Sequence, residues 1–332
     1  MPTRERLFGY QHAFDHPVTV IVTVGAIGVI ALALLATWLL ARAGKIDAKL
    51  RAELVSRCLS WLVLVPLMLT PVLLGAAWTI AAMGVLSLLC YREYARATGL
   101  FRQRDVSVIV VLGILAITYA VADHWYGFFV ALPSLTLAIL AAGTILRDEP
   151  KGYIQRVALG IFGYLLFGVC LGHFSYFAND ENYRPMMILI AAGVQMNDVF
   201  AFCCGKAMGR RKLALHTSPG KTIEGAAGAL VLTTILVAVM GHFVFRGTAL
   251  DSPLLLAGLG LLVSIGGVLG DLTLSSIKRD LGIKDMGATI PGHGGVLDRF
   301  NSLLLVAPAT FHYIGYFIGV GLDQPTRIIS GP

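Results

Sequence analysis

The chain has 332 residues, of which 57% are hydrophobic and only 14% are charged, and its formal net charge is +7. Soluble domains carry roughly 25% charged residues, and a soluble chain of this size needs far more polar surface to cover its core. These values exclude a soluble globular enzyme, a disordered chain and a disulfide scaffold. The five cysteines lie mostly in apolar runs and show no zinc-site spacing. The composition therefore predicts a polytopic membrane protein.

Ten apolar segments have the length of about 20 residues that a helix needs to cross a bilayer. One apolar run, residues 54–91, is too long for a single helix, and Thr70-Pro71 near its middle predicts a tight hairpin of two helices. The expected fold class is all-α, a polytopic bundle of about ten transmembrane helices. In chain order these helices are expected at residues 18–41, 54–70, 72–91, 106–122, 127–146, 156–177, 186–203, 224–245, 253–272 and 302–321.

The basic residues indicate how this bundle is oriented. With the N-terminus outside, most of the 26 Lys and Arg residues fall on five inward loops, which the positive-inside rule places in the cytoplasm. We expect an integral, multi-pass protein of a bacterial inner membrane with its basic loops cytoplasmic. Because the positive charge is scattered along membrane-flanking loops, its expected partners are membrane lipids and not nucleic acid. The loops at 42–57 and 92–105 are interpreted as solvated, lipid-facing ends.

Polar chemistry concentrates in the second half of the chain. Residues 1–180 are expected to form a lipid-facing helical scaffold, and residues 181–332 a catalytic region with cytoplasmic loops at 204–223 and 273–301.

The first polar cluster lies around the loop at 204–223. Asn197 and Asp198 occur inside an apolar helix, where a carboxylate costs on the order of 2.5–3.5 kcal/mol, so Asp198 is expected to face a wet cavity and a partner. Ser218, Lys221 and Thr222 supply hydroxyls and an ammonium just before a helix start, which attracts anions. The alternative is a Pro/Gly turn in which Thr222 is only the N-cap. The Walker spacing is missing, so no P-loop is predicted.

The second cluster follows the ninth expected helix. Asp271, Ser275 and Lys278 share one helical face because they are four and three residues apart. Carboxylates at Asp271, Asp285 and Asp298 can supply oxygen ligands for Mg²⁺. Cationic side chains that can neutralise phosphate oxygens accompany them, namely Lys278, Arg279, Lys284 and Arg299. Together these residues favour phosphoryl-transfer chemistry.

A glycine-rich turn lies within this second loop. Gly294 and Gly295 let backbone amides approach a phosphate closely. His293 beside them has three open roles: a general base, a phosphate ligand or a side chain that shapes the loop. The other histidines show no metal-ligand spacing.

The run from Ser275 to Asn301 resembles the signature of phosphatidate cytidylyltransferases, also called CDP-diacylglycerol synthases. The resemblance rests on Ser-x-Ile-Lys-Arg, Lys-Asp-x-Gly and His-Gly-Gly-Val-x-Asp-Arg-Phe, and it departs from the pattern at the closing Asp, which is Asn301 here. The segments at 197–198, 218–225 and 270–272 also resemble family motifs. The similarity covers roughly residues 186–301.

This resemblance implies a membrane enzyme that joins CTP to phosphatidate, or a closely related lipid phosphate, to give CDP-diacylglycerol and pyrophosphate. It implies Mg²⁺, alone or with a second cation, held by Asp271, Asp298 and Asp285. Lys221, Lys278 and the other cations would hold the triphosphate, and the family is compatible with a homodimer. Because Asn301 cannot ligate as an anion, Asn301→Asp is expected to retain or raise activity.

Two other functions are kept open. A CTP-dependent kinase of a lipid alcohol would use the same residues but release CDP instead of pyrophosphate. A transporter could use Asp198 in a broken helix, although the polar motifs are confined to one half of the chain.

Overall fold

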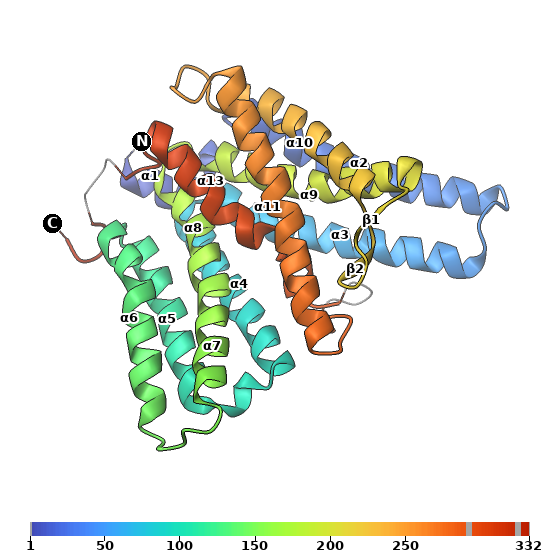
Figure 1. Cartoon of the computed structure of the whole chain (residues 1–332). Helices are drawn as coiled ribbons and strands as arrows, with labels where there is room; N and C mark the ends of the chain where they lie inside the picture. The colour runs from blue at the N-terminus through green and yellow to red at the C-terminus, as the bar shows by residue number, and fades with distance from the viewer. Residues whose placement is uncertain (1, 290–293, 323–326, 332) are drawn as a thin grey trace.

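The structure is a computed structural model that describes residues 2–289, 294–322 and 327–331 (Figure 1). Within those residues the chain is helical apart from one short antiparallel pair of strands. In order the elements are α1 (Thr3–Phe8), η1 (Tyr10–His12), α2 (Pro17–Arg42), α3 (Ala48–Leu74), α4 (Ala76–Ala97), η2 (Leu100–Arg102), α5 (Arg104–Ala122), α6 (Tyr126–Ile145), α7 (Tyr153–Gly163), the π-helix η3 (Tyr164–Cys170), α8 (Leu171–Tyr176), η4 (Phe177–Asn179), α9 (Tyr183–Met208), β1 (Lys212–Ala214), β2 (Ser218–Thr222), α10 (Ile223–Val244), α11 (Pro253–Asp280), α12 (Leu297–Phe300) and α13 (Leu303–Ile318).

The helices confirm the predicted polytopic membrane fold. In the described part of the chain, eight helical segments are long and apolar enough to span a bilayer, counting α7 to η4 as one. Two further segments were expected to cross. One is α13, which is apolar but shorter, and the other is α4, whose last turns carry charged residues. Each of the ten predicted segments is thus helical, and the crossings by α4 and α13 stay predictions.

The predicted hairpin turn at Thr70-Pro71 is wrong, because α3 runs on to Leu74 and the chain turns at Gly75. Gly75 has a φ of 147°, and a Cβ there would lie 2.2 Å from the Leu7 carbonyl oxygen, so the turn requires glycine. Pro71 lies inside the helix, where it removes one backbone donor, and a membrane helix tolerates this better than a helix in water. From this joint α3 and α4 diverge (Figure 1).

The segments predicted to lie outside meet at one end of the bundle. Arg6 donates to the Asn179 side chain at 3.0 Å, and Arg184 donates to a backbone carbonyl of the N-terminal segment at 2.8 Å. Asp123 accepts hydrogen bonds from the C-terminal residues 329 and 330. Two of the predicted inward loops, 204–223 and 273–301, meet through Arg279 and Thr217 and form the site described below.

Close backbone packing places α11 at the centre of this site. A Cβ at Gly270 would lie 2.6 Å from the Asn301 carbonyl oxygen, and one at Gly260 would lie 2.6 Å from Cα of Thr234 in α10. Glycine at these positions lets α11 approach the segments on both sides of it. The next residue, Asp271, is thereby brought against Asn301.

Candidate functional site

The loop at 204–223 folds back as a small hairpin. Strand β1 pairs antiparallel with β2, with Ala214 opposite Ser218, an extended element that the all-helical expectation did not include. Thr222 ends the hairpin and caps α10, since its hydroxyl accepts from the Gly225 amide at 3.0 Å. The alternative role predicted for Thr222, an N-cap, is therefore confirmed. The hairpin projects Lys221, whose Nζ lies 2.6 Å from Oδ2 of Asp271.

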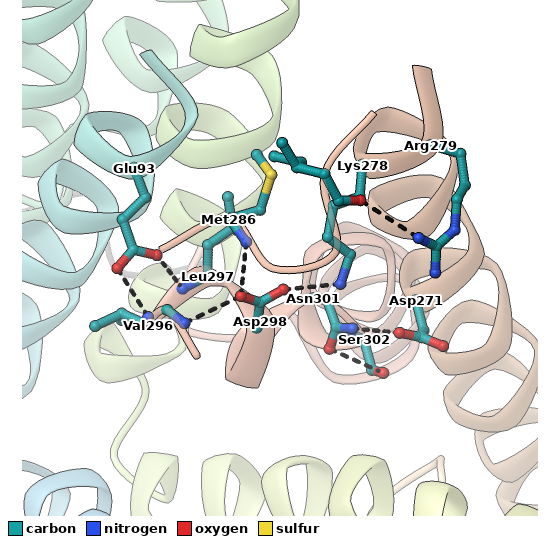
Figure 2. Close-up of polar contacts among 12 residues, drawn as sticks. Glu93, Asp271, Lys278, Arg279, Met286, Val296, Leu297, Asp298, Asn301 and Ser302 are labelled. Carbon is teal, nitrogen blue, oxygen red and sulfur yellow. Dashed lines mark hydrogen bonds and ion pairs between the residues drawn. The ribbon is translucent and has the colours of Figure 1, made fainter. Parts of the chain in front are cut away.

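Five side chains from four segments meet around Asp271, and we call them the Asp271 cluster: Asp198, Lys221, Asp271, Asn301 and Ser302. The Asn301 amide donates to the Asp271 carboxylate (Figure 2), and the Ser302 hydroxyl donates to Asp198 at 3.2 Å. Asp198 lies within electrostatic range of both Lys221 and Asp271. The Ser302 hydroxyl is thus a partner for Asp198, and a carboxylate in a membrane helix needs one. The cluster joins α9, β2 and α11 to the start of α13.

Asn197 holds helices together and does not face this cluster. It is fully buried, and its carbonyl oxygen accepts from the Ser264 hydroxyl at 2.6 Å and from the Thr233 hydroxyl at 3.1 Å. These bonds tie α9 to α11 and α10. A substrate contact was predicted for Asn197, and its bonding instead supports a role in fixing the helix that carries Asp198.

The Asp298 carboxylate binds groups of the loop in which it lies. One carboxylate oxygen pairs with Lys278 at 2.8 Å, and the other accepts the Met286 amide at 2.9 Å and the Gly295 amide at 3.0 Å (Figure 2). Its side chain is only 4% exposed. Asp298 therefore binds groups of its own loop on both oxygens and is nearly closed to solvent.

The two glycines of the loop serve its internal packing. Gly294 has a φ of +80°, a left-handed conformation that favours glycine. A Cβ at Gly295 would lie 2.4 Å from Oε2 of Glu93 and 2.9 Å from the Gly287 amide nitrogen. Gly295 therefore admits a buried carboxylate, whereas the sequence analysis predicted that the pair admits a phosphate.

Glu93 is the residue that the sequence analysis missed. It lies on α4, is 5% exposed, and accepts hydrogen bonds from the Thr289 hydroxyl at 2.6 Å, the Val296 amide at 3.0 Å and the Leu297 amide at 2.9 Å. The interpretation of residues 92–105 as solvated, lipid-facing ends is therefore wrong for this position (Figure 2). Glu93 lies between Arg92 and Arg96 near the end of a predicted helix, and this pattern resembles ordinary surface charge. One signal could have found it: a short carboxylate is less suited than Lys or Arg to reach the membrane interface.

The other predicted site residues are distributed around these groups. Arg279 donates to the Thr217 carbonyl at 3.2 Å and so links the two loops, while Ser275 is buried on α11. Lys284 and Asp285 are exposed, and Arg299 lies within electrostatic range of Asp198. His293 falls outside the described residues.

In the described ranges no three His, Cys, Asp or Glu side chains are grouped as metal ligands. The assignment of Asp271, Asp285 and Asp298 to a metal therefore stays a prediction. Asp298 binds its loop amides, whereas Asp271 faces Lys221 and Asn301. The carboxylate that accompanies Asp271 is Asp198.

Comparison with known proteins agrees with this picture of a polar site among membrane helices. Residues 55–317 match the family model described as the Cytidylyltransferase family. The protein is thus a nucleotidyltransferase that its helices embed in the membrane. It belongs to the Cytidylyltransferase family, as its sequence signature predicted.

Curated relatives include proteins with and without a named activity. "Uncharacterized protein YnbB" of Escherichia coli (strain K12) is 32% identical over 251 residues, which are 74% of this chain and 82% of that protein. A phosphatidate cytidylyltransferase of Bacillus subtilis (strain 168) is 34% identical over 228 residues, 64% of this chain and 80% of its own length. One of Staphylococcus aureus (strain COL) is 44% identical over 115 residues, 35% of this chain and 43% of its own.

Proposed function

We propose that the protein transfers the cytidylyl group of CTP to phosphatidate or a closely related lipid phosphate at the cytoplasmic face of a bacterial inner membrane. The products are CDP-diacylglycerol and pyrophosphate. The observation that carries this proposal is the Asp271 cluster. In it an ammonium and two carboxylates come together at the junction between membrane helices and a polar loop. The names of the Bacillus and Staphylococcus relatives support the lipid substrate.

The reaction places particular demands on such a site. An oxygen of the lipid phosphate attacks the α-phosphorus of CTP, the bond from that phosphorus to the bridging oxygen breaks, and pyrophosphate leaves with the electron pair. A phosphate monoester is largely ionised near neutral pH, so no strong general base is needed. Both reactants are anions, and cations must reduce their repulsion. The chain provides these cations as Lys221, Lys278, Arg279, Lys284 and Arg299.

The donor set of the Asp271 cluster fits a hard divalent cation. Asp198 and Asp271 offer carboxylate oxygens close enough to influence each other, and Mg²⁺ binds through one or two carboxylates plus substrate phosphates. When bound there, Mg²⁺ would screen phosphate charge and favour attack at phosphorus. Asp298 is less suited to this role, because its side chain is 4% exposed, against 21% for Asp271. It orients Lys278.

The test is product analysis with purified protein in lipid nanodiscs, supplied with Mg²⁺, phosphatidate, a lipid alcohol and CTP labelled at either its α- or its γ-phosphate. We expect the α-label in the lipid and the γ-label in pyrophosphate. A lipid-alcohol kinase would instead place the γ-label in the lipid and release CDP. Solute movement without CTP consumption would support a transporter, and either of these results would refute the proposal.

Asn301 should determine how strongly the cluster binds a cation. Asn301→Asp replaces the amide that donates to Asp271 with a third carboxylate in the cluster, and facing carboxylates repel until a cation is bound. We expect turnover at saturating Mg²⁺ to be retained and the Mg²⁺ concentration for half-maximal activity to fall several-fold. The shift of Tm with Mg²⁺ should show the same change.

Asn301→Ala is the matched control for this experiment, since it removes the donor without adding charge. It should lower turnover and leave the Mg²⁺ midpoint unchanged. If Asn301→Asp instead loses activity at every Mg²⁺ concentration, the amide hydrogen bond to Asp271 is itself required.

A further inference from the structure

A large apolar groove separates α3 from α4. Its volume is about 1260 Å³, and its walls are one face of each helix together with residues of α8, α9 and the segment 289–303. The lining residues of α3 recur every three or four positions over residues 48–72, and those of α4 do so over residues 79–89, which is the spacing of a single helical face. Pockets for small molecules usually measure roughly 300–1,000 Å³, so this groove suits a longer ligand.

The dimensions and polarity of the groove fit a lipid chain. Residues 48–72 of α3 extend about 36 Å at 1.5 Å per residue, comparable to the roughly 30 Å thickness of a bilayer's hydrocarbon core. Among the described lining residues, Arg51 carries the charge, and it lies in the first turn of α3, near the inner loops. A groove that is apolar along its length and cationic at its inner end matches a chain with an anionic headgroup.

Part of the groove wall belongs to the segment that carries the candidate active site. Val296 and Phe300 line the groove, and Val296 is one of the residues whose amides are held by Glu93. Phe300 immediately precedes Asn301, which donates to Asp271. A chain lying in the groove would therefore bring its headgroup toward the Asp271 cluster.

We propose that the groove between α3 and α4 holds an acyl chain of the phosphate-bearing lipid substrate, with Arg51 attracting the lipid phosphate at its inner end. This proposal rests on the proposed function, and it assigns the lipid-binding element to the first half of the chain. The groove then selects lipids by chain length, whereas the Asp271 cluster acts on the headgroup.

The first test fills the groove. Leu67→Trp adds bulk at a lining position, and Leu62→Trp adds the same bulk at a position of α3 that is not among the described lining residues. Both leucines are exposed, 67% and 49% respectively, so the protein should fold with either change.

For Leu67→Trp we expect kcat/KM for dipalmitoyl phosphatidate to fall about tenfold, with little change for dioctanoyl phosphatidate or in the KM for CTP. Leu62→Trp should leave all of these values near wild type. Equal effects of the two variants, or equal loss with both lipids, would overturn the proposal.

A binding measurement separates this proposal from the proposed function. The probe is phosphatidate with a photoreactive diazirine in one acyl chain, crosslinked to the protein in nanodiscs and mapped by mass spectrometry. We expect labelling of α3 and α4, reduced by Leu67→Trp and by unlabelled phosphatidate but not by phosphatidylcholine. This result would support the groove even if phosphatidate were not converted. Labelling that phosphatidylcholine competes equally well, or that spreads evenly over α5 and α6, would show bulk lipid and overturn it.

Variants of Arg51 test whether this residue attracts the lipid phosphate. Arg51→Ala should raise the KM for phosphatidate several-fold without changing kcat, and Arg51→Lys should restore most of the affinity because it keeps the charge. Lys49→Ala is the matched control, since Lys49 lies two residues away and is not among the described lining residues. An unchanged KM in Arg51→Ala would overturn the assignment of Arg51.

Discussion

Replacing Glu93 with alanine should abolish turnover and lower the stability of the protein. Three donors, the Thr289 hydroxyl and the amides of Val296 and Leu297, would lose their buried acceptor. Each unsatisfied buried donor costs about 1–3 kcal/mol, so the loop would leave its position and carry Asp298 with it. We expect kcat to fall by about 10² or more, and Tm to fall by several degrees. Steady-state kinetics and thermal unfolding in nanodiscs measure the two effects.

Glu93→Gln makes this test more specific. The amide keeps the shape of the side chain, but it offers one acceptor oxygen where the carboxylate offers two, so an intermediate loss is expected. Arg96→Ala changes an exposed charge in the last turn of α4 and should behave like wild type. Glu93→Ala with full activity would show that the loop does not depend on α4.

Asp271→Asn should reduce kcat strongly while leaving the protein folded. The change keeps the shape of the side chain and removes the charge that pairs with Lys221 at 2.6 Å. Both side chains of this pair are 21% exposed, so water can solvate the remaining ammonium and stability should change little. Losing a positioned charge at a phosphoryl-transfer site typically costs about 10²–10³ in rate. Labelled CTP turnover at saturating Mg²⁺ measures it.

Two further variants test whether Asp271 and Lys221 act as one unit. Lys221→Met should cause a similar loss, and the double variant should be little worse than either single one, because residues in direct contact are not additive. Asp280→Asn, at the exposed end of the same helix, is the control and should retain normal turnover. If Asp271→Asn still consumed CTP at the wild-type rate, the cluster would not be the catalytic site.

The sequence was sufficient for the parts of the fold that depend on local composition. Apolar length predicts each membrane helix, and the helical spacing of Asp271 and Lys278 correctly places them on one helix, α11. The turn after α3 was misplaced because proline is a weaker break in a membrane helix than in water. The true turn, at Gly75, depends on contact with the Leu7 backbone, which no local pattern reveals.

The sequence predicted the types of residue in the site better than it predicted which of them contact each other. Ion pairing of Lys221 with Asp271 requires segments from two different loops to meet, and that of Lys278 with Asp298 requires one loop to fold back on itself. From its residue type alone, Asp298 could be a metal ligand or a residue that holds its loop in place. The two backbone amides that donate to it, which only the structure shows, favour the second role. Glu93 could not be found because its partners lie about two hundred residues later in the chain.

The separation of 203 residues between Glu93 and Val296 has a consequence for biogenesis. A ribosome completes α4 long before it synthesises the amides that this carboxylate binds, so Glu93 lacks these donors while six further helical segments are synthesised. Non-local contacts of this kind form late. Folding is then completed late, when the segment that contains Val296 and Leu297 binds to Glu93, a residue synthesised early in translation.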